Sequence, residues 1–146
     1  MDPTNPRRVV SHKVPTINEK QLQNQITQVL RLLGYTIMET GKARGKTKCP
    51  KCNVYSYATG WQGNTAGLPD LYIHSINWPT ALALAVELKT QTGTVRKEQK
   101  ELNDKGLTTI CRSLLCVLNA VLRIETLLHN DIAIEKIERM KEVNGY

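Results

Sequence analysis

Asp70, Glu87 and Lys89 are the residues whose types and spacing point most directly to chemistry. Glu87 and Lys89 lie two positions apart at the end of an apolar run, residues 81–89, that reads as a buried strand. Because side chains alternate along a strand, the two share one face and lie about 7 Å apart. Asp70 follows a Gly-Leu-Pro turn and enters the preceding strand. Pairing of these strands would bring Asp70 beside Glu87, and two adjacent carboxylates repel unless a cation lies between them.

These three side chains together predict a metal site with a positive charge beside it. Oxygen ligands suit Mg²⁺ or Mn²⁺. A bound metal polarises a phosphate and lowers the pKa of an attacking water, while a lysine can orient or deprotonate that water or neutralise charge in the transition state. Phosphodiester hydrolysis needs these functions. For Glu87 and Lys89 alone, the alternative is a structural salt bridge near a strand end.

The remaining pattern predicts an α/β fold that positions these residues. A capping box of Thr16 and Glu19 followed by an apolar stripe predicts a helix that ends at Gly34. Strands are expected at 35–40, 71–75, 81–89 and 107–112, and helices at 94–105, 113–129 and 131–143. The expected order is therefore α-β-β-β-α-β followed by two C-terminal helices.

The chain of 146 residues is long enough for one domain. Residues 1–15, with three prolines and four basic residues, are expected to form a flexible basic arm. Residues 16–146 are expected to form a single domain. Residues 41–66 form a Cys/Lys-rich insertion with almost no hydrophobic periodicity, and a loop of that length in a compact domain is usually functional or disordered.

The motifs that contain Asp70, Glu87 and Lys89, together with their flanking elements, resemble the VRR-NUC (virus-type replication-repair nuclease) branch of the PD-(D/E)xK nuclease superfamily. The resemblance covers residues 17 to about 128. Its motifs are a helix that opens with a Glu and ends in a Gly, a Gly-x-Pro-Asp turn, a Glu-x-Lys strand, a Gln on the next helix and a Gly before a short final strand. They correspond in order to Glu19, Gly34, Gly67-Pro69-Asp70, Glu87-Lys89, Gln99 and Gly106.

The resemblance implies a restriction-endonuclease-like core with a central mixed four-stranded sheet flanked by helices. It also implies that Asp70, Glu87 and the backbone carbonyl of Leu88 hold the metal, and that Lys89 acts on the water. Glu19 would reach the metal directly or through water, unless it serves only in the capping box.

Gln99 would lie near Lys89 and the scissile phosphate; the alternative is a solvated helix residue. Stand-alone members of the resembled family are associated with viral genomes and with branched DNA such as Holliday junctions. The expected activity is therefore a structure-selective endonuclease, acting on junctions or flaps in DNA replication, recombination or repair. A homodimer is expected because two cuts across a junction need two sites, and the apolar C-terminal helices could supply a dimer surface.

The charge balance favours a polyanionic partner. Lys and Arg number 20 against 13 Asp and Glu, which gives a formal net charge of +7. Several of these cations cluster in the insertion, with Tyr55, Tyr57 and Trp61 downstream as candidate stacking groups. They are expected to contact the DNA backbone without reading sequence; a solvated loop is the alternative. The cations are Lys42, Arg44, Lys46, Lys48 and Lys51.

Cys49 and Cys52 have the spacing of a zinc knuckle, in which two thiolates share one tetrahedral ion. Two further ligands are needed, and Cys111 and Cys116 read better as buried structural cysteines. Zn²⁺ at the Cys-Pro-Lys-Cys turn, including a zinc ion shared between two copies of the chain, is therefore an open alternative to an unliganded loop.

No apolar stretch is long enough to span a membrane, and the N-terminal residues lack the apolar core of a secretory signal. The expected location is the cytoplasm. Two other functions remain open: a non-catalytic nucleic-acid-binding module on a nuclease scaffold, and a zinc-stabilised interaction protein.

Overall fold

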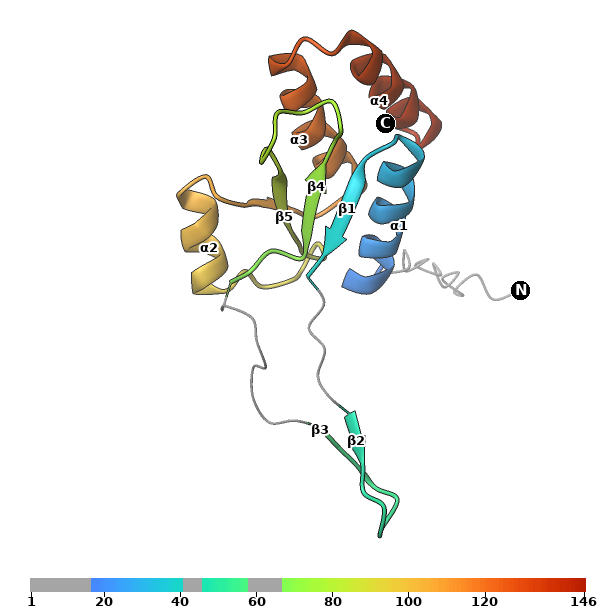
Figure 1. The fold of residues 1–146 in the computed structure, drawn as a ribbon, viewed down its shortest axis with the longest axis vertical. Coiled ribbons are helices and arrows are strands. Elements are labelled where there is room, and N and C mark those ends of the chain that lie inside the picture. Colours follow the sequence, from blue (N-terminus) through green and yellow to red (C-terminus); the bar gives the residue numbers. More distant parts are fainter. Residues whose placement is uncertain (1–16, 41–45, 58–66) are drawn as a thin grey trace, which may run out of the picture.

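A computed structural model describes residues 17–40, 46–57 and 67–146 (Figure 1). The described part is α/β, with a four-stranded mixed sheet, a separate two-stranded hairpin and four helices. The expected arm at 1–15 lies outside the described residues. The elements are α1 (Glu19–Leu32), β1 (Thr36–Glu39), β2 (Lys46–Lys48), β3 (Tyr55–Tyr57), β4 (Leu71–His74), β5 (Leu84–Leu88), α2 (Lys97–Asp104), β6 (Thr109–Cys111), α3 (Leu114–Leu127) and α4 (Asp131–Val143).

The main sheet has the strand order β1-β4-β5-β6. β1, β4 and β5 pair antiparallel, whereas β5 and β6 pair parallel and are joined through α2. Within the described residues, the order of elements in and around this sheet agrees with the expected α-β-β-β-α-β-α-α. The interior strand β5 is covered on both faces, because Ala85, Val86, Glu87 and Leu88 are all buried. The prediction of a buried strand is confirmed for these residues.

β5 begins later than its apolar composition indicates. The strand starts at Leu84, not at Ala81, because Ala81 adopts a left-handed φ of 68° and Leu82 N–H closes a turn onto Pro79 O at 3.0 Å. A left-handed residue cannot continue a pleated strand. The expected strand bounds of 81–89 are therefore wrong, and the strand covers Leu84–Leu88.

The N-terminal cap of α1 also differs from the prediction. Asn18, not Thr16, is the N-cap: its Oδ1 accepts the backbone N–H of Gln21 at 2.8 Å, and Gln21 Oε1 accepts the N–H of Asn18 at 3.0 Å. This reciprocal pair satisfies two helix N-terminal donors. The capping role proposed for Glu19 is therefore wrong, and the Glu19 side chain has no part in this box.

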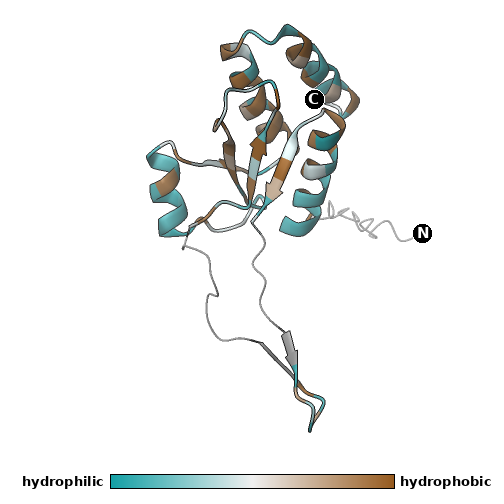
Figure 2. Ribbon diagram, in the orientation of Figure 1, coloured by the Kyte–Doolittle hydropathy of each residue, from teal (hydrophilic) through white to brown (hydrophobic). Residues whose placement is uncertain are grey.

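The helices pack through the apolar faces that the periodicity predicted. α1 contacts β1, β5 and α3, and α3 contacts β6 and α4. Figure 2 shows brown, hydrophobic segments in the strands of the main sheet, whereas α2 is mostly teal, hydrophilic. The fully buried members of this core are Ile26, Leu30, Leu71, Ile73, Val86, Cys111, Val117, Leu118, Val121 and Ile137. Among the described residues, no helix has both the length and the apolar character to cross a membrane.

Glu125 is a carboxylate buried at the far end of this core. Its Oε1 accepts hydrogen bonds from Tyr35 Oη at 2.6 Å and Trp78 Nε1 at 2.9 Å, and its Oε2 accepts from Asn130 Nδ2 at 2.8 Å. Burial and this carboxylate raise the pKa of Tyr35. The network ties α3 to the end of α1 and to the turn after β4.

We expect Glu125→Ala to lower the free energy of unfolding by about 2–4 kcal/mol, since the buried hydroxyl of Tyr35 and the indole N–H of Trp78 lose their acceptor. Urea unfolding followed by far-UV circular dichroism measures the change. The matched control is Glu138→Ala, which removes a half-exposed carboxylate from α4; its effect should stay within about 0.5 kcal/mol. Equal effects of the two substitutions would contradict a structural role for the network.

Candidate active site

The pairing of β4 with β5 places the two predicted acidic ligands opposite each other. Leu71 pairs with Val86 in an antiparallel register, so the preceding residue Asp70 lies across from Glu87. Asp70 Oδ2 accepts the backbone N–H of Leu88 at 2.8 Å, which fixes the carboxylate against β5. The expectation that the two carboxylates lie side by side agrees with this register.

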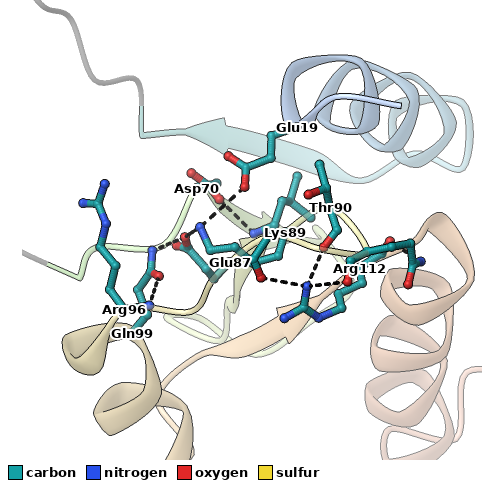
Figure 3. A network of polar contacts seen from close by, with 11 residues as sticks. Glu19, Asp70, Glu87, Lys89, Thr90, Arg96, Gln99 and Arg112 are labelled. Carbon is teal, nitrogen blue, oxygen red and sulfur yellow. Dashed lines mark hydrogen bonds and ion pairs between the residues drawn. The ribbon is translucent and has the colours of Figure 1, made fainter. Parts of the chain in front are cut away.

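Lys89 lies between carboxylates from two elements (Figure 3). Its Nζ is 2.8 Å from Glu87 Oε1 and 3.8 Å from Glu19 Oε1. The side chains of Glu87 and Lys89 are only 2% and 10% exposed, whereas that of Glu19 is 53% exposed. The ion pair suggested for Glu87 and Lys89 is therefore present, and it lies within the same group of side chains as Asp70 and Glu19.

Gln99 contacts this group directly. Its side chain is buried, its Nε2 donates to Glu87 Oε1, and its Oε1 accepts the backbone N–H of Arg96 at 2.9 Å. The alternative of a solvated helix residue is wrong for Gln99. Through these two hydrogen bonds Gln99 links the start of α2 to the carboxylate of Glu87 in β5. The same carboxylate is ion-paired with Lys89.

Arg112, just after β6, holds the segment that follows Lys89. Its Nη1 donates to the backbone carbonyls of Thr90, Gln91 and Gly93, the last at 3.0 Å (Figure 3). Gly93 lies close to Glu19, because a Cβ built on Gly93 would be 3.4 Å from Glu19 Oε1. The Arg112 guanidinium therefore holds residues 90–93 in place beside Glu19 of α1. Sequence reasoning missed Arg112, since no local pattern shows this tertiary contact.

The turn that presents Asp70 is held from both sides. Thr40, after β1, donates its hydroxyl to Pro69 O, and its N–H donates to Asp70 O at 3.0 Å. Gly67 has a φ of +88° and packs on α2, where an added Cβ would lie 3.2 Å from Glu98 Cβ and from Leu102 Cδ1. Sequence reasoning also missed Thr40, whereas Gly67 belongs to the predicted turn.

We expect Gly67→Ala to impair both folding and any activity of the site. A left-handed alanine costs about 1–2 kcal/mol, and the new methyl group would displace α2, which carries Gln99. Gly34→Ala is the matched control, because Gly34 also has a positive φ but open space around its Cβ position. Urea unfolding should show a loss in both variants, while cleavage assays should show a loss only for Gly67→Ala. Intact cleavage by Gly67→Ala would contradict the importance of this packing.

The donor set fits a hard divalent cation. Asp70 and Glu87 supply carboxylate oxygens, and the Leu88 main chain lies directly at the site through its N–H bond to Asp70. Among the described residues, no group of three or more His, Cys, Asp or Glu side chains is arranged to hold a metal. Mg²⁺ is commonly bound through one or two carboxylates and keeps several waters, so Asp70 and Glu87 would be enough carboxylate ligands for it.

Three of the five predicted DNA-contacting cations lie in the β2–β3 hairpin. Lys42 and Arg44 lie outside the described residues. Lys46 begins β2, Lys48 ends it and is exposed, and Lys51 is exposed in the following turn. The insertion at 41–66, in which no strand was expected, contains an antiparallel hairpin, and Lys48 pairs with Tyr55 in it.

Cys49 and Cys52 occupy the turn of this hairpin, with Cys49 partly exposed and Cys52 exposed. Hydrogen bonds from the backbone N–H and side chain of Cys52 and from the N–H of Lys51 lower the pKa of the Cys49 thiol. Cys111 and Cys116 lie elsewhere, at the junction of β6 and α3, with their sulfurs 2.8 Å apart. Cys111 is fully buried in the core. The structure does not bring the two cysteine pairs together within one described cluster.

Comparisons of the chain with models of protein families, with curated proteins and with solved structures give no match.

Proposed function

We propose that the chain is a metal-dependent endonuclease that hydrolyses phosphodiester bonds of DNA on a restriction-endonuclease-like core. The observation that supports the proposal most is the juxtaposition at the ends of β4 and β5. Asp70 lies opposite Glu87, and Lys89 is ion-paired to Glu87 at 2.8 Å. This is the arrangement expected for the Pro-Asp and Glu-x-Lys motifs of PD-(D/E)xK nucleases.

The charges of the site favour a bound cation. In formal charges, Glu19, Asp70 and Glu87 contribute three negative charges, and Lys89 contributes one positive charge. Glu87 is almost completely buried, so water screens its charge poorly and the repulsion between neighbouring carboxylates is costly. A divalent cation between Asp70 and Glu87 would neutralise the two remaining negative charges.

The residues around the cation have separable roles in this proposal. When bound, the ion would polarise the scissile phosphate and lower the pKa of a nearby water. Lys89 would orient that water through its Nζ or stabilise negative charge on the phosphate. Gln99 would keep Glu87 in place through its hydrogen bond, and Glu19 would fix Lys89 from the α1 side.

DNA is the proposed substrate because of the chain's formal charge of +7 and the exposed lysines of the hairpin. Such contacts would bind the backbone in a sequence-independent way. We further propose selectivity for branched DNA and a role in replication, recombination or repair, with a homodimer supplying two sites. This part depends on the resemblance of the motifs to VRR-NUC nucleases.

The proposal is tested by incubating the purified chain with a labelled four-way junction, a flap, a nicked duplex, single-stranded DNA and plain duplex, in the presence of Mg²⁺ or Mn²⁺. We expect metal-dependent cleavage, strongest on the branched substrates, and none with EDTA. Asp70→Asn, prepared in parallel, controls for contaminating nucleases. If the chain binds DNA but does not cleave it under any metal condition, the proposed nuclease activity is refuted. The remaining function is then a non-catalytic nucleic-acid-binding module.

Replacing Lys46 and Lys48 together with Gln should weaken DNA binding and flatten its salt dependence. The slope of log K against log salt should fall by roughly one unit for each phosphate that the protein no longer neutralises. Fluorescence anisotropy at several salt concentrations measures the slope. The control Arg139→Gln/Lys141→Gln removes the same charge from α4, outside the hairpin. An equal change in both double variants would mean that the hairpin does not bind the DNA backbone specifically.

A further inference from the structure

Cys49 and Cys52 lie on the turn between β2 and β3, which backbone hydrogen bonds close. Cys49 N–H donates to Val54 O at 2.9 Å and Asn53 N–H donates to Cys49 O at 3.0 Å, so the two cysteines are held on one tight turn. Asn53 directly follows Cys52 and adopts a left-handed φ of 57°. The left-handed residue lets the chain fold back, and the N–H groups of Lys51 and Cys52 point at the sulfur of Cys49. Two thiolates at this spacing suit one tetrahedral Zn²⁺.

One such turn supplies only half of a structural zinc site, because zinc there takes four ligands. The chain has four cysteines, and the other two form their own contact in the core between β6 and α3. His74 is also engaged, since its Nδ1 is 2.7 Å from Leu82 O and its ring contacts Trp78 edge-on. Within the described residues, no third His, Cys, Asp or Glu joins Cys49 and Cys52.

A second copy of the chain would complete the site with chemically identical ligands. Figure 1 shows the hairpin extending away from the main sheet, with the turn at its far end. A two-fold axis through the ion would place two turns tip to tip, the self-complementary contact typical of homodimers. Charge also favours this occupant. Zn²⁺ with four thiolates carries a formal charge of −2, and Lys48 and Lys51 of each copy would lie beside it as counter-charges.

We propose that Cys49 and Cys52 of two copies of the chain bind one Zn²⁺ through four thiolates and so join the hairpins into a homodimer. Binding deprotonates four thiols and releases four protons. The proposal concerns the assembly of the protein and stands independently of the nuclease activity.

The test uses the full chain, purified with Zn²⁺ and freed of excess metal. Elemental analysis should give one zinc ion per two chains, and analytical ultracentrifugation should give a dimer. Removal of the zinc with a chelator should yield monomers, and readdition should restore the dimer. Co²⁺ in place of Zn²⁺ should show the intense sulfur-to-metal charge-transfer bands of a four-thiolate tetrahedral site.

Cys49→Ser/Cys52→Ser should lose the zinc and become monomeric. The matched control is Cys116→Ser, which removes a thiol outside the hairpin and should keep both zinc and dimer. Asp70→Asn should also keep both, so a failure of the nuclease proposal remains separable from a failure here. One zinc per monomer, a dimer that survives both chelation and the double substitution, or a protein without zinc would each overturn the shared site.

Discussion

Asp70→Asn is expected to abolish metal-dependent cleavage, with a loss of about a thousandfold or more, because it removes one of the two carboxylates proposed to hold the ion. The substitution is nearly isosteric. The asparagine carbonyl can still accept the N–H of Leu88, as the Asp70 carboxylate does. Folding should therefore be retained, and DNA binding in the absence of metal should be retained or slightly strengthened, since one negative charge is removed.

Single-turnover cleavage of a labelled junction measures the rate, and urea unfolding verifies the fold. Asp104→Asn at the end of α2 is the control, since it removes an acidic charge from an exposed position outside the site. That control should cleave at the wild-type rate. Cleavage by Asp70→Asn within a few-fold of wild type would remove Asp70 from the mechanism.

Lys89→Met should have the second large effect, a loss of about 10²–10⁴-fold in cleavage, because the group proposed to orient the water is removed. A second consequence concerns stability. Glu87 is 2% exposed and would lose the ammonium now 2.8 Å away, so the metal-free variant should be destabilised by about 3 kcal/mol. Mg²⁺ should recover part of that loss, since the ion would replace the missing positive charge beside Glu87.

The measurement is the thermal midpoint of each variant with and without Mg²⁺, together with the cleavage rate. The shift produced by metal should be larger in Lys89→Met than in wild type. Lys97→Met on α2 is the control, since the Lys97 side chain is 85% exposed and its partner Glu101 lies 3.9 Å away; it should change stability by less than about 1 kcal/mol. Full cleavage activity of Lys89→Met would contradict the proposed site, and so would a thermal midpoint of this variant that does not change when Mg²⁺ is added.

The main sheet could be predicted from the sequence because its central strand carries an unusually strong signal. The apolar run around Val86 indicates burial on both faces, and the Pro-Asp turn indicates the neighbouring strand. The strand boundary could not be predicted, since the left-handed conformation of Ala81 follows from the turn after Pro79 and not from the composition. The hairpin at 46–57 was missed for a related reason. Its strands have three residues each and show no apolar alternation.

The part of the candidate site that depends on strand periodicity and on pairing of neighbouring strands could be predicted from the sequence. Two-residue periodicity placed Glu87 and Lys89 together, and strand adjacency placed Asp70 opposite Glu87. The contacts that join distant segments could not be predicted. The hydrogen bonds from Arg112 to the loop after Lys89 connect residues about twenty positions apart. The hydrogen bond from Thr40 to Pro69 connects the end of β1 to the turn before β4. Neither leaves a periodic signal.

The most direct test of the proposed site is a crystal structure of the chain with Mn²⁺, in which anomalous scattering locates the ion. The proposal predicts a peak about 2.1 Å from carboxylate oxygens of both Asp70 and Glu87 and from the Leu88 carbonyl, with Lys89 Nζ beside it. Asp70→Asn crystals under the same conditions should lack the peak. An ion bound elsewhere in a protein that still cleaves DNA would contradict the assignment of these residues as the metal site.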